Sequence, residues 1–183
     1  ILARTVNRLG YYVYGYKLFS SRIKGGHTNY KLRIGTEPVS STSSDLQILV
    51  AIDQVTIDRN WKELVPGSLV IADPKWEPVL PEGCPARLLP VEMTAIAQEL
   101  GNPLVRNMVA LGASVYLLGL SEEAVREQVM EVFGDKGEKV QQLNAAALSR
   151  GYQVAKEAFP EGPPFALDPA HGGPRLLLSG NEA

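Results

Sequence analysis

Apolar and polar positions alternate along this chain in patterns that predict strands interleaved with helices. Tyr30, Leu32 and Ile34 alternate with polar residues, which is typical of a half-buried strand. The runs 46–52 and 68–72 are nearly all apolar, as strands buried on both faces of a parallel sheet are. We predict strands at residues 11–19, 29–34, 46–52, 68–72 and 85–91.

Helical periodicity fills the intervals between and after these strands. We expect Gly10 just past the end of a first helix, and Thr94 and Ser121 as N-caps of later ones. The other predicted helices cover 54–65, which closes at Pro66-Gly67, and 94–100, 104–118, 121–133 and 136–159. The alternation indicates an α/β fold: an open, mostly parallel, Rossmann-like sheet with helices on both faces, followed by a C-terminal helical segment and a linker.

A run rich in proline and glycine divides the chain near its C-terminus. Residues 160–174 hold five prolines and three glycines, a composition typical of a linker. The chain starts with Ile1 rather than Met and stops in mid-pattern, so we expect both ends to be cuts in a longer polypeptide. The predicted organisation is a domain at 1–159, a linker at 160–174 and the start of another domain at 175–183.

Composition and charge argue against several classes of protein. Hydrophobic residues make up 45% of the chain, enough for a proper core, and the net charge of −2 argues against general nucleic-acid binding. The single cysteine, Cys84, excludes an internal disulfide framework or a cysteine-rich metal or iron–sulfur site, and fits a reducing cytoplasm. The most apolar run, 108–120, is shorter than the roughly 18 residues that cross a bilayer, so we expect no membrane span.

The usual catalytic constellations are missing from the sequence. The two histidines lie far apart, and no spacing of His, Cys, Asp and Glu suggests a metal site, so we predict neither catalytic nor metal-binding residues. Asp53 and Asp73 follow strand ends, where functional acids often lie. Capping of the following helix or turn is the favoured interpretation of both.

The strongest candidate site is the run "SSRIKGGHT", which joins the first two predicted strands. A phosphate-binding loop needs glycines that let backbone N–H groups converge, cations that supply charge, and hydroxyls that add donors. This run provides all three through Ser20, Ser21, Arg22, Lys24, Gly25, Gly26 and Thr28. The alternative is a solvated surface loop with a Gly-Gly turn, in which His27 bonds locally.

The strands beside this run carry aromatic and cationic residues. Tyr11, Tyr12, Tyr14 and Tyr16 allow base stacking, but core and interface packing is favoured at strand spacing in a chain of such small net charge. Lys31 and Arg33 are expected on a solvated or partner-facing strand face.

The segment "YGYKLFSSRIKGGHTNYKLRIG" resembles the gamma domain of 2-oxoacid:ferredoxin (flavodoxin) oxidoreductases. That domain carries a Ser-Arg/Lys-x-x-Gly-Gly-x-Thr/Ser run that leads into a strand ending Leu-Arg-Ile/Phe-Gly. The matching positions are Ser21, Arg22, Gly25, Gly26, Thr28, Leu32, Arg33 and Gly35, with Lys24 beside them. "DLQILVAID" and "NMVALGA" are similar to later family motifs, so the resemblance spans most of residues 9–160.

The resemblance extends to both ends of the chain. "LLLSGNEA" is similar to the start of the thiamine-diphosphate-related alpha domain, which follows the gamma domain in fused subunits resembling the 2-oxoglutarate oxidoreductase alpha subunit. The family's gamma domain begins with a strand and a glycine-rich turn, and residues 1–8 would be the helix after that turn. Half of the family's ligand site would then precede Ile1.

The resemblance also implies a function. The complete enzyme decarboxylates a 2-oxoacid oxidatively on thiamine diphosphate, passes electrons through an iron–sulfur cluster to ferredoxin and makes an acyl-CoA. The gamma domain holds neither thiamine diphosphate nor cluster, and contributes coenzyme A contacts and assembly. Expected partners are a beta subunit with those groups, ferredoxin through the complete enzyme, and the rest of the alpha domain. The alternative is a non-catalytic interaction module whose Gly-Gly loop contacts a partner subunit.

Overall fold

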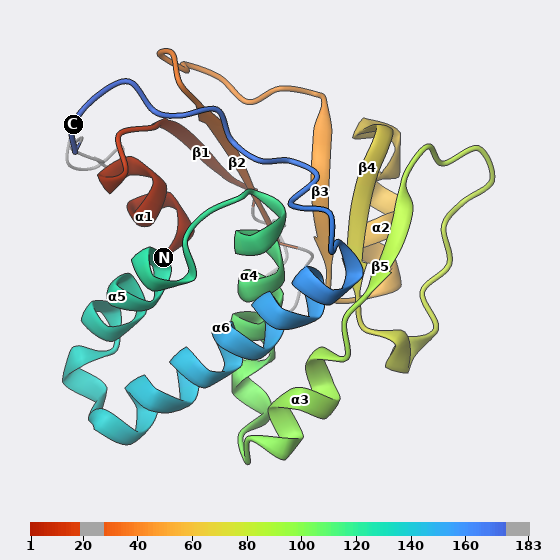
Figure 1. The fold of residues 1–183 in the computed structure, drawn as a ribbon. Coiled ribbons are helices and arrows are strands. Elements are labelled where there is room, and N and C mark those ends of the chain that lie inside the picture. The colour runs from red at the N-terminus through yellow and green to blue at the C-terminus, as the bar shows by residue number, and fades with distance from the viewer. Residues whose placement is uncertain (19–27, 175–183) are drawn as a thin grey trace. The chain divides into compact units, whose positions relative to one another are not determined.

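The computed structural model describes residues 1–18 and 28–174, which Figure 1 draws as a coloured ribbon. The chain divides into two compact units. One comprises Ile1–Ser43 with Leu167–Ala183, and the other Ser44–Ala166. We call them the hairpin unit and the sheet unit and describe each by itself. None of the helices in the two described ranges is long and apolar enough to cross a membrane.

The sheet unit is built on three parallel strands in the order β3-β4-β5. These are β3 (Leu46–Ala51), β4 (Leu64–Ala72) and β5 (Arg87–Pro90). The central strand β4 is buried on both faces, since Leu69, Val70, Ile71 and Ala72 are all at most 2% exposed. Burial on both sides explains why residues 69–72 of this strand are all apolar rather than alternating.

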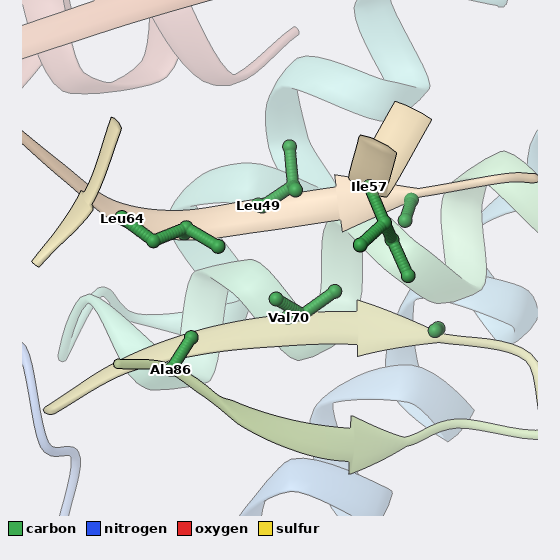
Figure 2. Packing of buried hydrophobic residues seen from close by; sticks show 7 residues of the cluster. Leu49, Ile57, Leu64, Val70 and Ala86 are labelled. Carbon is green, nitrogen blue, oxygen red and sulfur yellow. The ribbon is translucent and has the colours of Figure 1, made fainter. Parts of the chain in front are cut away.

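One face of the sheet is covered by α2 (Gln54–Asn60), which begins directly after β3. Figure 2 shows Ile57 reaching from α2 to the strands, beside the side chains of Leu49 and Val70. Ile57 is fully buried. Removing a side chain of this size from water contributes about 1.5–3 kcal/mol to stability, so this contact fixes the crossover helix on the sheet.

Four further helices complete the sheet unit: α3 (Met93–Glu99), α4 (Arg106–Leu117), α5 (Glu122–Val132) and α6 (Glu138–Ala158). Helices α4 and α6 pack closely, because Gly112 of α4 lies against the carbonyl oxygen of Leu148, and Gly151 of α6 against that of Val109. A Cβ at either glycine would collide with backbone of the other helix. The motif "NMVALGA" therefore holds a residue that sets the distance between two helices.

The hairpin unit consists of α1 (Leu2–Arg8), β1 (Tyr12–Leu18) and β2 (Asn29–Gly35). Strands β1 and β2 pair with each other, antiparallel, as a two-stranded sheet. Gly10 has φ +94° and donates its N–H to the carbonyl of Asn7 at 3.1 Å, which ends α1 in the left-handed conformation that glycine favours. The expected position of Gly10 is thus confirmed.

The run predicted as a linker makes contacts within each unit. In the sheet unit, the N–H of Phe165 donates to the carbonyl of Leu117 at 3.0 Å. In the hairpin unit, the hydroxyl of Tyr11 donates to the carbonyl of Asp168 at 3.0 Å, and Gly172 lies against Gly10. The segment between α6 and residue 174 is therefore held to each unit at a few points, although none of its residues is buried.

The α/β class, the parallel sheet and the C-terminal helical segment are confirmed, but one boundary is wrong. We expected a helix through Val65 that closed at Pro66-Gly67, whereas α2 ends at Asn60, a 3₁₀ turn covers Trp61–Glu63, and β4 begins at Leu64. Pairing of Leu64 with Leu46 starts the strand early, and the register shifts between Leu46 and Ile48. Such irregular pairing is where a strand tolerates a proline, so Pro66-Gly67 lies inside the strand.

Candidate functional site

The predicted phosphate loop connects the two strands of the hairpin. Thr28 is exposed and directly precedes β2. The other predicted site residues, Ser21, Arg22, Lys24, Gly25 and Gly26, lie outside the described residues, as do Ser20 and His27. The structure therefore places Thr28 alone of this set.

The two strands of the hairpin fix the positions of the residues on either side of the run 19–28. Pairing between β1 and β2 continues to Leu18 opposite Asn29, the last residues of the two strands. Paired residues in antiparallel strands have Cα atoms about 4.5–5.5 Å apart. The residues on either side of the run 19–28 are consequently held next to each other.

The hairpin register sorts its side chains onto two faces, because successive side chains of a strand point to opposite sides. Val13, Gly15 and Lys17 share a face with Tyr30, Leu32 and Ile34, which confirms the predicted alternation of β2. The other face carries Tyr12, Tyr14 and Tyr16 opposite Lys31 and Arg33. The guanidinium of Arg33 donates to the carbonyl of Ser41 at 3.2 Å, so it is partly engaged within the unit.

The tyrosines before the loop differ in their surroundings. Tyr11 is buried, which agrees with the expected packing role, and burial together with the charge of Asp168 raises the pKa of its hydroxyl. Tyr16 is 45% exposed near the loop end of β1. Packing within the unit therefore accounts for Tyr11, whereas interface packing of Tyr16 stays a prediction.

One contact near the paired strand ends Leu18 and Asn29, a place that we call the mouth of the hairpin, was not predicted from the sequence. Lys17 lies opposite Tyr30, and its Nζ is 5.9 Å from the centre of the Tyr30 ring. The ring lies over Gly15, since a Cβ on that glycine would collide with the Tyr30 hydroxyl. Only the antiparallel register reveals this arrangement, because Lys17 and Tyr30 stand on either side of the loop in the sequence.

A second place for chemistry is the edge of the parallel sheet where the strands end. Asp53 follows β3 and caps α2: its Oδ1 accepts from the N–H of Thr56 at 2.8 Å and from the Thr56 hydroxyl at 2.6 Å. The favoured capping role of Asp53 is confirmed. This acid connects the sheet to its crossover helix.

Asp73 follows β4 and is 4% exposed. Its Oδ1 accepts from the N–H of Lys75 at 3.0 Å, and its Oδ2 accepts from the N–H of Thr94 at 2.7 Å. The capping role is again confirmed. The prediction that Thr94 is an N-cap is wrong, because α3 begins at Met93 and the acceptor for the N–H of Thr94 is Asp73, directly after strand β4.

The hollow beside Asp73 is small. It is lined by Ile52, Asp73, Trp76, Met93, Thr94 and Arg106, and it holds about 20 Å³, room for about one water molecule. Within residues 1–18 and 28–174, no group of three or more His, Cys, Asp or Glu side chains could hold a metal ion. The sheet edge thus serves to position helices, and the hairpin is the better candidate for binding.

Comparison with known proteins places this geometry in a family. A family model described as "Pyruvate ferredoxin/flavodoxin oxidoreductase" matches residues 1–154. The "2-oxoacid:ferredoxin oxidoreductase 2, subunit alpha" of Aeropyrum pernix is 24% identical over 227 aligned residues, which cover 100% of this chain and 35% of the relative. The "2-oxoglutarate synthase subunit KorC" of Methanocaldococcus jannaschii is 28% identical over 144, which cover 76% of this chain and 75% of the relative.

A solved structure extends the likeness to three dimensions. The 2-oxoglutarate:ferredoxin oxidoreductase from Magnetococcus marinus, with 2-oxoglutarate, coenzyme A and succinyl-CoA bound, has a TM-score of 0.81 and 28% identity over 93% of this chain and 30% of its own. The chain spans about a third of the length of the alpha subunits that it matches. Because the family model covers most of its residues, the chain belongs to the pyruvate ferredoxin/flavodoxin oxidoreductase family.

Proposed function

We propose that this chain is the gamma portion of a 2-oxoacid:ferredoxin oxidoreductase, and that it supplies coenzyme A contacts and subunit assembly rather than the redox chemistry. The complete enzyme would oxidise a 2-oxoacid to an acyl-CoA and pass the electrons to ferredoxin. Family membership supports this class of enzyme. Within the proposal, residues 1–159 are the gamma-type domain, 160–174 the linker and 175–183 the start of the alpha domain.

The observation that carries the proposal is the hairpin. Its last strand pair, Leu18 opposite Asn29, holds together the ends of a run with cations, hydroxyls and a Gly-Gly pair. Coenzyme A presents a pyrophosphate and a 3′-phosphate, which suit cations and free backbone N–H groups. We assign the coenzyme contacts to Ser21, Arg22, Lys24, Gly25, Gly26 and Thr28. The Magnetococcus marinus relative has coenzyme A bound.

The redox groups of such an enzyme do not fit this chain. Iron–sulfur clusters are held by several cysteine thiolates, and the sequence has only Cys84. The hollow at the sheet edge is far below the roughly 300 Å³ of a cofactor pocket, so it does not suit thiamine diphosphate. We assign both groups to a beta subunit. The other proposed partners are the rest of the alpha domain and ferredoxin, which is reached through the complete enzyme in the cytoplasm.

A second function, as an interaction module without ligand contacts, is supported by exposed apolar side chains on the sheet unit. Val79 is 65% exposed and Leu104 84% exposed. Side chains of this kind are often covered by a partner. In this alternative the Gly-Gly run contacts a partner subunit, and coenzyme A binds elsewhere in the enzyme.

Calorimetric titration of the intact enzyme with coenzyme A separates the two functions. We expect Arg22→Ala and Lys24→Ala each to weaken binding about 10- to 100-fold, since each removes a charge-assisted contact to a phosphate. Arg126→Ala is the matched control, because Arg126 is an exposed arginine of the sheet unit. Wild-type affinity in both loop variants would overturn the phosphate contacts and favour the interaction module.

A further inference from the structure

Cationic residues are concentrated in the hairpin unit. Residues 1–43 contain seven lysines and arginines and a single acid, Glu37, although the whole chain has a net charge of −2. Three of these cations, Lys17, Lys31 and Arg33, lie on the strands of the hairpin. A local excess of one charge raises the concentration of oppositely charged ligands around it, so this unit favours anions.

Lys17 and Tyr30 are placed at the mouth of the hairpin, one pair in from Leu18 and Asn29. Within the described part of the chain, the ammonium of Lys17 has no hydrogen bond or ion pair, and its one contact of note is with the Tyr30 ring. Tyr30 is 51% exposed, and its ring rests over Gly15 of the neighbouring strand. The backbone register therefore places the Lys17 ammonium over an exposed aromatic ring.

We propose that Lys17 and Tyr30 bind a phosphorylated adenosine, with the base stacked on the Tyr30 ring and a phosphate paired with the Lys17 ammonium. Aromatic side chains hold bases by stacking, and a nearby lysine supplies the charge that a phosphate needs. Coenzyme A carries such a group at the end opposite its thiol. This inference rests on the proposed function and adds two residues, outside the Gly-Gly run, for one end of the coenzyme.

A purely structural role for Tyr30 makes a different prediction. Aromatic rings often lie over a cross-strand glycine and stabilise the strand pair by covering its bare backbone. In that case, replacing Tyr30 lowers stability and affects all ligands alike. Stacking, in contrast, affects only ligands that contain the base.

The experiment titrates the intact enzyme with adenosine 3′,5′-bisphosphate and, separately, with 4′-phosphopantetheine, the two ends of coenzyme A. We expect Tyr30→Leu to weaken binding of the adenosine bisphosphate about tenfold and to leave phosphopantetheine unchanged. Tyr30→Phe keeps the ring and the affinity. Lys17→Met weakens the adenosine bisphosphate about fivefold. Tyr16→Leu is the matched control, since Tyr16 is 45% exposed on the opposite face of the hairpin.

The outcomes separate this inference from the proposed function. It is overturned if Tyr30→Leu leaves adenosine bisphosphate binding unchanged, or weakens both probes equally. If Arg22→Ala weakens coenzyme A while the Lys17 and Tyr30 variants do not, the Gly-Gly run still contacts the coenzyme and only the adenosine site fails. If Arg22→Ala and Lys24→Ala have no effect either, the proposed function fails as well. Thermal unfolding of each variant shows whether the hairpin remains folded.

Discussion

The hairpin unit and the sheet unit stabilise themselves in different ways. The sheet unit encloses an apolar core, joins its helices through two glycines and uses its buried acid to satisfy backbone donors. The hairpin unit has two strands, half-exposed tyrosines and an excess of cations. A two-stranded sheet is only marginally stable alone. Exposed aromatic residues on it add little to its stability, so they are candidates for binding. In the function that we propose, the sheet unit supplies the packed framework and the hairpin unit supplies the side chains that contact a ligand.

The largest effect is expected where α4 meets α6. Gly112→Ala and Gly151→Ala each place a methyl group against backbone of the other helix, which cannot give way as a side chain can. We expect the free energy of unfolding to fall by about 3 kcal/mol in each variant, measured by urea denaturation. Gly134→Ala is the control, since a Cβ there meets only the end of the Gln141 side chain at 3.9 Å. If all three variants were equally stable, the account of close helix packing would be wrong.

A smaller effect is expected at the capping acids. Asp73→Ala leaves the N–H groups of Lys75 and Thr94 without their acceptor in a buried place, and we expect a loss of about 2–3 kcal/mol. Asp53→Ala removes an exposed cap of α2, for which the expected loss is about 1 kcal/mol. Chemical denaturation of both variants provides the comparison. An equal loss of unfolding free energy for the two variants would show that the burial of Asp73 does not increase its contribution to stability.

In the hairpin unit we expect an effect as small as that of Asp53→Ala. Tyr11→Phe removes the hydrogen bond to the carbonyl of Asp168, and we expect a loss of about 1 kcal/mol. Because burial raises the pKa of Tyr11, its contribution is fully present below about pH 10, the ordinary tyrosine pKa, and is lost as the pH rises through the folded-state value. Denaturation between pH 8 and 11 should therefore show a gap between wild type and variant that narrows at high pH. A gap that stayed constant would contradict this role.

The sequence correctly predicted those features of the fold that depend on a local pattern of residues. Strand β2 alternates as expected, Gly10 ends α1, and the apolar runs are the paired strands β3 and β4. It did not predict that Asp73 would supply the acceptor at the start of α3, because the two partners lie 21 residues apart and meet only through the sheet. The predicted end of α2 was wrong for a related reason. A Pro-Gly pair usually ends a helix or strand, but β4 pairs with β3 both before and after Pro66-Gly67 and so includes it.

The candidate site was only partly predictable. The phosphate-binding hypothesis for Ser21, Arg22, Lys24, Gly25, Gly26 and Thr28 comes from residue types and stays a prediction, and the structure adds that Leu18 and Asn29, on either side of their run, are paired. The contact of Lys17 with Tyr30 depends on strand register, which residue types alone do not specify. Long-range pairing is therefore what the structure added to the site.

The most direct test of the binding role is the affinity of the intact enzyme for coenzyme A when the cations of one unit are removed at a time. The variant with both Arg22→Ala and Lys24→Ala is compared with one carrying Arg126→Ala and Lys139→Ala, two exposed cations of the sheet unit. We predict that the first variant loses at least about 100-fold in affinity, and that the second stays near wild type. Equal affinities in the two variants would contradict the assignment of coenzyme contacts to the hairpin unit.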